Sequence, residues 1–322
     1  MVSALGLLEA CPGNAPAPAD ASGGPLPKAA GQGDPEAGKV DAPSAAAGSS
    51  SASSAAPVKA AAAEPEPPGP AGVLFVGRYD TRDPAGPRAG WPGSRAIVRF
   101  DGSGLTAKIS EQANPYRGPS AYDVIVDGKV QAQPLYPANG LKDYVLASGL
   151  APGIHVVELW RRTEGRVGVT QLRGFEVSGG QLRAPPVPKG RRIEFVGDSS
   201  INGFGVECGS MYEEFSNKTQ NERKAYPALV AAALGAEHEN VSYSGKGVLR
   251  NFDEGDKETF ATLYARAQPD DPTSATKAGA FDPDVVFVAL GGNDFSGPKE
   301  RPAPDVPAFK AKYHELLTLI RA

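Results

Sequence analysis

The chain has 322 residues, of which 40% are hydrophobic, and this is enough to form the cores of two ordinary domains. Its formal net charge of −4 argues against a nucleic-acid partner and against a polybasic membrane-binding patch. The two cysteines, Cys11 and Cys208, are far apart in the sequence and define neither a disulfide framework nor a zinc site.

Residues 1–11 (MVSALGLLEAC) are apolar but lack the basic start and the long apolar core of a complete signal peptide. Their end, LEAC, resembles a bacterial lipobox apart from the glutamate. Two interpretations stay open: a signal-peptide remnant with a lipid anchor at Cys11, or no signal at all. The first places the protein outside a bacterial cell, secreted or anchored at the cell surface. No other apolar run approaches the length of about 18 residues that a membrane span requires.

Residues 12–70 consist mainly of Ala, Pro, Ser and Gly and contain no aromatic residue. Such a segment cannot bury a core, so we expect a disordered linker. It would act either as a tether or as a dispensable tail.

Residues 71–187 contain short β-prone runs and almost no helical periodicity. Asp127-Gly128 between two such runs is a strong hairpin signal. Many short strands separated by Gly and Pro predict a β-sandwich. The expected strands are residues 73–77, 95–100, 105–110, 122–126, 144–147, 155–160 and 169–177.

Residues 188–322 alternate strands with helices, which predicts a parallel sheet with helices on its faces. The apolar run 193–196 ends at Gly197 and leads into a Gly-Asp-Ser turn that contains Ser199. Chemistry in open α/β sheets collects at the carboxyl ends of such strands, where a serine can present its hydroxyl and its N–H to a carbonyl carbon. The motif alone is weak, because Gly, Asp and Ser also form ordinary turns.

Two later segments repeat this arrangement. Gly245 and Gly247 follow a second β-prone run, and Asn293 follows a third. Taken alone, Gly245 could be an ordinary loop glycine and Asn293 an ordinary turn-forming residue. These explanations do not account for three such residues, each directly after a predicted strand. Helices are expected at residues 227–234, which Gly235 ends, and at residues 310–320.

The order Gly-Asp-Ser, then Gly, then Gly-x-Asn-Asp resembles the first three conserved blocks of the SGNH (GDSL) hydrolases. The resemblance implies that Ser199 is the nucleophile and that the Ser199 N–H, the Gly245 N–H and the Asn293 amide form an oxyanion hole. Gly247 is the less favoured candidate for the second role, because Ser-Gly-Lys around Gly245 fits the family pattern better.

The phrases Gly-Arg at 77–78, Trp-Pro-Gly-Ser at 91–94, Val-Asp-Gly at 126–128 and Arg-Arg-Thr-Glu at 161–164 resemble the jelly-roll domain of carbohydrate esterase family 2. The resemblance covers roughly residues 72–320. It implies a multi-domain fold: an all-β jelly-roll sandwich at 71–187, followed by an incomplete α/β three-layer, flavodoxin-like SGNH domain at 188–322.

The family carries an Asp-x-x-His loop whose histidine takes the proton from the serine, and no such pattern occurs here. His155 falls in a sandwich strand, His238 just before the second sheet strand and His314 in the last helix, and we expect structural or solvated roles for all three. Residues 191–322 have room for about three sheet strands, whereas the superfamily usually has five. We therefore expect that the coding sequence is truncated at its C-terminus and that the fragment is inactive.

The activity implied by the resemblance is hydrolysis of O-acetyl esters on plant polysaccharides or oligosaccharides through an acyl-serine intermediate. No metal or organic cofactor is implied, and we expect a monomer. The alternatives are an inactive remnant or a carbohydrate-binding protein without the histidine, or a general carboxylesterase or lipase of the SGNH superfamily. The appended sandwich favours a sugar substrate.

Overall fold

The computed structural model describes residues 71–187, 190–210, 212–276, 281–297 and 300–321. These residues all belong to one compact unit of the chain. The expected signal remnant, the lipid anchor at Cys11 and the linker at 12–70 lie outside the described residues and stay predictions.

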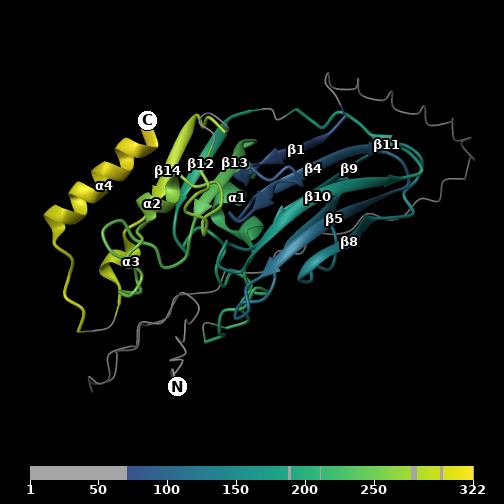
Figure 1. Cartoon of the computed structure of the whole chain (residues 1–322). Helices are drawn as coiled ribbons and strands as arrows, with labels where there is room; N and C mark the ends of the chain where they lie inside the picture. Colours follow the sequence, from purple (N-terminus) through teal and green to yellow (C-terminus); the bar gives the residue numbers. More distant parts are fainter. Residues whose placement is uncertain (1–70, 188–189, 211, 277–280, 298–299, 322) are drawn as a thin grey trace, which may run out of the picture. The chain divides into compact units, whose positions relative to one another are not determined.

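Two antiparallel sheets make up the strand-rich N-terminal part (Figure 1). The first has the strand order β1-β4-β9-β6-β7, with β11 also paired to β4, and the second has the order β2-β3-β10-β5-β8. Their strands are β1 (Val73–Val76), β2 (Tyr79–Asp80), β3 (Arg88–Ala89), β4 (Arg95–Asp101), β5 (Gly104–Ala113), β6 (Tyr122–Val126), β7 (Lys129–Val130), β8 (Gly140–Ala147), β9 (Ile154–Arg161), β10 (Gly168–Ser178) and β11 (Gln181–Leu182).

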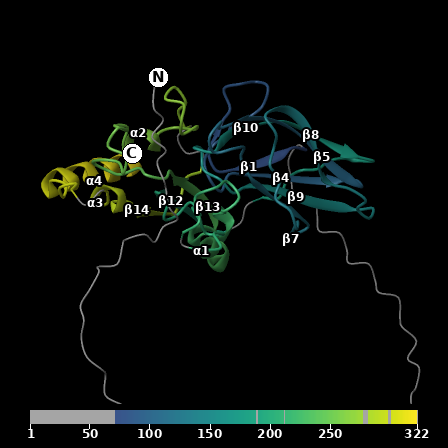
Figure 2. The same cartoon turned by 90° about the horizontal axis from the view of Figure 1, so that it is seen from below.

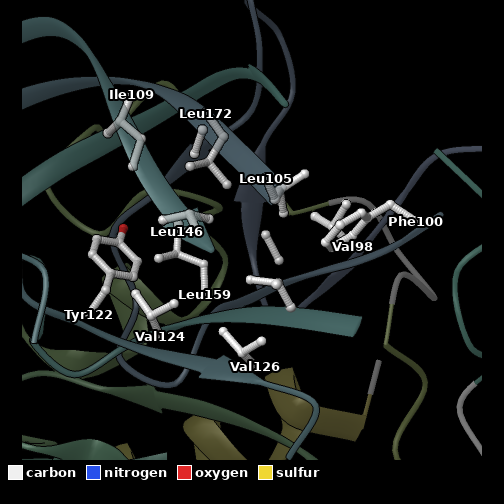
Figure 3. Close-up of a cluster of buried hydrophobic side chains, with 13 residues drawn as sticks. Val98, Phe100, Leu105, Ile109, Tyr122, Val124, Val126, Leu146, Leu159 and Leu172 are labelled. Carbon is white, nitrogen blue, oxygen red and sulfur yellow. The ribbon is translucent and has the colours of Figure 1, made fainter. Parts of the chain in front are cut away.

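The two sheets share one apolar core. Strand β5 shows the reason: Leu105, Ala107 and Ile109 are buried and alternate with half-buried polar residues, the period of two that a half-covered strand requires. Side chains from both sheets meet in this core, among them Val98, Phe100, Tyr122, Val124, Leu146, Leu159 and Leu172 (Figure 3).

All seven strands predicted from the sequence are present. The four short strands β2, β3, β7 and β11 were not predicted, because two residues are too few to show any periodicity. The predicted hairpin is confirmed: Asp127 and Gly128 have φ angles of 48° and 75° and connect β6 to β7. Two positive φ angles match the type I′ turns that suit the strand twist.

The remaining strands form a parallel sheet of order β13-β12-β14 (Figure 2), in agreement with the prediction. Its strands are β12 (Arg192–Gly197), β13 (Glu237–Ser242) and β14 (Val285–Ala289). The helices are a short 3-10 turn η1 (Glu222–Lys224), α1 (Tyr226–Leu234), α2 (Phe260–Tyr264), α3 (Gly292–Phe295) and α4 (Val306–Arg321).

Neighbouring residues of the central strand β12 pack in different clusters. Phe195 has its ring against that of Tyr226 at the start of α1, and Val196 lies in a cluster with Leu263 of α2 and Leu316 of α4. Trp91, which belongs to the sandwich sequence, is fully buried in that second cluster and donates its indole N–H to the carbonyl oxygen of Arg266 at 3.1 Å. The two parts therefore share apolar packing.

Gly235 ends α1 in a left-handed conformation, as predicted. Helix α4 begins at Val306, four residues before the predicted start, and Asp305 accepts a hydrogen bond from the Ala308 N–H at 3.1 Å. The short helices α2 and α3 were not predicted, because four or five residues show no helical period.

Strand β13 corrects a prediction. It begins at Glu237, so His238 lies inside the strand and not before it. The start of the strand could not be predicted, because its sequence Glu-His-Glu-Asn is polar. Such side chains are buried in a strand only when residues from elsewhere in the fold supply their hydrogen bonds. The structure supplies them: Glu239 accepts from Arg78 Nε at 2.7 Å, and His238 is paired with Glu222 at 2.9 Å.

None of the helices in the described ranges is long and apolar enough to cross a membrane.

Candidate active site

The carboxyl ends of the three parallel strands carry the three residues that the sequence singled out. Ser199 follows β12, Gly245 follows β13 and Asn293 lies in the first turn after β14. Because the strands are parallel and in register, these ends lie at one edge of the sheet. Asn293 Nδ2 donates to the carbonyl oxygen of Lys246 at 2.9 Å and to Asp198 Oδ2 at 3.1 Å, which joins the three loops.

The turn that carries Ser199 is tightly built. A Cβ atom on Gly197 would lie 2.7 Å from Ile201 Cδ1 and 2.8 Å from the carbonyl oxygen of Ala289, so only glycine fits where β12 ends. The carboxylate of Asp198 accepts the Ser200 N–H at 2.9 Å. Ser199 is half-buried, and neither its N–H nor its hydroxyl forms a hydrogen bond within the described part of the chain. Both groups are available to a ligand.

The structure separates the two glycines after β13. Gly245 has a φ angle of +80°, which favours glycine, and its N–H donates to no acceptor among the described residues. The Gly247 N–H already donates to Asn251 Oδ1 at 3.0 Å. Gly245, and not Gly247, therefore has the free donor that an oxyanion hole requires.

Asn293 is less free. Its two Nδ2 protons face the Lys246 carbonyl and the Asp198 carboxyl. Burial raises the pKa of Asp198, and the charge of nearby Asp294 raises it further. To donate to a bound oxyanion, the Asn293 amide would exchange the Asp198 oxygen for the ligand.

The sequence analysis assigned no role to Asp294, which is fully buried beside Asn293. Its carboxylate accepts three consecutive backbone N–H groups, from Val248 at 2.9 Å, Leu249 at 2.7 Å and Arg250 at 3.0 Å. The residue thereby ties the loop after β14 to the loop after β13. Its position in the motif Gly-Gly-Asn-Asp was the only available signal.

None of the three histidines is hydrogen-bonded to Ser199. His155 pairs with Asp127 at 2.8 Å, where the Ala151 carbonyl and the Asp127 carboxylate raise its pKa against the opposing effect of burial. His238 pairs with Glu222, and His314 is exposed on α4. His155 and His238 thus have carboxylate partners and His314 faces solvent, and the structural or solvated roles expected for them stay predictions. No cluster of residues suited to a metal ion occurs within the described ranges.

Two known families match the chain. The family described as "Carbohydrate esterase 2 N-terminal" matches residues 75–186, and the "GDSL-like Lipase/Acylhydrolase family" matches residues 195–322. A solved structure of a family two carbohydrate esterase from Clostridium thermocellum, in complex with cellohexaose, is 32% identical with a TM-score of 0.71. The match covers 78% of this chain and 74% of that chain. The chain belongs to carbohydrate esterase family 2.

Curated relatives of this family 2 member carry enzyme names. The cellulase/esterase CelE of Acetivibrio thermocellus is 33% identical over 257 residues, which is 78% of this chain but 29% of that protein. An acetylxylan esterase/glucomannan deacetylase of Cellvibrio japonicus is 32% identical over 211 residues, or 64% of this chain and 55% of that protein. The family 2 chain therefore spans less than two thirds of either relative.

Proposed function

We propose that the protein is a serine esterase that removes O-acetyl groups from plant polysaccharides or oligosaccharides. The observation that carries the proposal is that Ser199 and Gly245 lie at one edge of the parallel sheet and that, among the described residues, neither their N–H groups nor the Ser199 hydroxyl forms a hydrogen bond. Two backbone donors next to a nucleophile are what acyl transfer through an oxyanion requires.

The proposed reaction begins with attack of Ser199 Oγ on the acetyl carbonyl carbon. The Ser199 and Gly245 N–H groups, with the Asn293 amide, hold the negative charge that develops on the carbonyl oxygen. The bond between the acetyl carbon and the sugar oxygen then breaks, and the sugar leaves as a hydroxyl that has taken up the proton lost by Ser199. Water next attacks the acetyl-serine: its oxygen leaves with the acetyl group as acetate, and one of its protons restores the hydroxyl of Ser199.

The substrate class follows from the family. Relatives are named acetylxylan esterase/glucomannan deacetylase, and one solved relative holds cellohexaose. We extend this to acetyl esters of plant glycans, commonly at the sugar 6-position, and to a secreted or lipid-anchored location in a bacterium. The finer fold assignments, a jelly roll followed by a three-layer flavodoxin-like domain, are part of the same proposal.

A second candidate is carbohydrate binding without turnover. It is favoured by the placement of the histidines, none of which contacts Ser199 in the described part of the chain. A serine hydroxyl without a base is a weak nucleophile. The two functions differ in whether Ser199 becomes acetylated.

The test measures acetate release from acetylated xylan and hydrolysis of p-nitrophenyl acetate, with and without added imidazole as a free base. Ser199→Ala should abolish the enzyme-dependent rate, and mass spectrometry should find the acetyl group on Ser199 of the unaltered chain. Ser200→Ala, one residue away and exposed, is the matched control and should keep the rate. Glycan binding by calorimetry with no Ser199-dependent acetate release would instead establish the binding function.

A further inference from the structure

The connection between β9 and β10, residues 162–167, carries a buried carboxylate that contacts the loop with Gly245. Glu164 is 1% exposed. Its Oε2 accepts the Ser244 N–H at 2.7 Å, and its Oε1 accepts the Ser244 hydroxyl at 2.6 Å. The Ser244 hydroxyl oxygen in turn accepts a hydrogen bond from Asn202 Nδ2 at 2.9 Å, and Asn202 belongs to the loop after β12 that carries Ser199. One side chain of the sandwich thus contacts the loop after β13 directly and is linked to the loop after β12 through the Ser244 hydroxyl.

A second residue of the same connection, Arg166, contacts the peptide group that joins Ser244 to Gly245. Arg166 Nη1 donates to the carbonyl oxygen of Ser244 at 3.4 Å. This carbonyl belongs to the peptide group whose N–H is that of Gly245. In a planar trans peptide the C=O and the N–H point in opposite directions, so a contact that fixes the oxygen also fixes the direction of the Gly245 N–H.

The backbone of Glu164 is held in place by hydrogen bonds on both sides of the peptide chain. Its N–H donates to Gln220 Oε1 at 3.3 Å, and its carbonyl oxygen accepts from Arg161 Nη2 at 3.2 Å. Arg161 is fully buried and also donates to the carbonyl oxygen of Gly168 at 2.5 Å. The carboxylate therefore projects from a connection that is hydrogen-bonded on both sides, and not from a free loop.

We propose that Glu164 and Arg166 are positioning residues of the esterase, which set the Ser244–Gly245 peptide so that its N–H meets the oxyanion. This inference rests on the proposed function, because it assigns the Gly245 N–H to the oxyanion. It gives the sandwich a part in catalysis: its β9–β10 connection completes the active site from outside the sheet. A misplaced donor lowers the stability of the transition state more than that of the bound substrate, so the effect falls on kcat.

A contact that only joins the two parts of the molecule provides the comparison. Arg95 of β4 pairs with Glu237, the first residue of β13. This contact lies at the amino end of the strand, whereas Gly245 follows its carboxyl end. Glu237→Gln and Glu164→Gln both replace a glutamate by glutamine. The first changes a contact at the start of β13, and the second changes a contact with the loop after β13. They differ in whether the contact touches the Gly245 peptide.

The kinetic test measures Ser199-dependent hydrolysis of p-nitrophenyl acetate. We expect Glu164→Gln to lower kcat by about tenfold or more with KM within about twofold, since loss of a whole oxyanion donor costs about 10²–10³. Arg166→Met should lower kcat in the same direction, and Glu237→Gln should leave it within about twofold. Equal kcat values for the Glu164 and Glu237 variants would overturn the inference.

A second measurement needs no turnover. Labelling with carbonyl-¹³C serine and ¹⁵N glycine restricts a carbonyl-edited amide spectrum to the Ser-Gly peptides, which begin at residues 22, 103, 148, 178, 244 and 296. Ser244→Ala removes one signal and so assigns the Gly245 amide.

That Gly245 signal should move in Glu164→Gln and Arg166→Met and stay in place in Glu237→Gln. An unmoved signal in Glu164→Gln contradicts the positioning role. Full hydrolysis by Ser199→Ala would contradict the proposed function instead, and the amide signal would still decide whether Glu164 sets the Gly245 peptide.

Discussion

The substitution Asp294→Asn tests how much the contact between the loop after β14 and the loop after β13 stabilises the protein. It removes one negative charge and keeps the size of the side chain. In the native chain, Oδ1 accepts the N–H groups of Leu249 and Arg250, and Oδ2 accepts that of Val248. The asparagine carbonyl can keep the first two bonds. Its NH₂ group then faces the Val248 N–H, so one buried donor loses its acceptor and the other two lose a charged one.

Each of these losses has a known scale. A hydrogen bond to a charged group contributes about 1.5–3 kcal/mol, and an unsatisfied buried donor costs about 1–3 kcal/mol. Allowing for relaxation, we expect Asp294→Asn to reduce the free energy of unfolding by about 3 kcal/mol. At about 2–4 °C per kcal/mol, this lowers Tm by about 6–12 °C, measurable by calorimetry.

The matched control is Asp305→Asn. Asp305 accepts one exposed N–H, from Ala308 at the start of α4, and asparagine caps a helix as well as aspartate does. We expect a change below about 0.5 kcal/mol. The reasoning is refuted if the two variants have the same Tm, since the three-fold acceptor role of Asp294 would then carry no energy.

Three further predictions use other measurements. Gly247→Ala should destabilise the loop, because its Cβ would lie 2.0 Å from the carbonyl oxygen of Arg250, while Gly72→Ala, with no atom within 4 Å, should leave Tm unchanged. Burial alone would raise the pKa of Glu222, but the His238 charge and the hydrogen bonds to the carboxylate lower this pKa on balance. The ionised Glu222 side chain therefore stabilises the fold fully above the ordinary carboxyl pKa, and this stabilisation is lost as pH falls through the lowered pKa. The stability gap between the native chain and Glu222→Gln in urea unfolding should therefore shrink from about pH 6 to about pH 3, and a constant gap would exclude this ionisation. Limited proteolysis should remove residues 12–70 and leave a stable core, whereas resistance of that segment would contradict the predicted linker.

The sequence determined those features that depend on neighbours along the chain. The alternation of residues in β5 and the apolar run of β12 predicted strands, and Asp127-Gly128 predicted a hairpin, because side-chain period and backbone preference are local properties. The placement of Ser199, Gly245 and Asn293 at one edge followed as well, since parallel strands put equivalent ends together.

Only the tertiary structure decided how polar residues are satisfied. The buried polar strand β13 depends on Arg78 and Glu222, and Glu164 meets Ser244 from 80 residues away. A buried carboxylate is tolerable only where distant donors meet it, and no local pattern shows which donors those are. For the same reason, the free N–H of Gly245 and the occupied N–H of Gly247 are indistinguishable in the sequence and distinct in the fold.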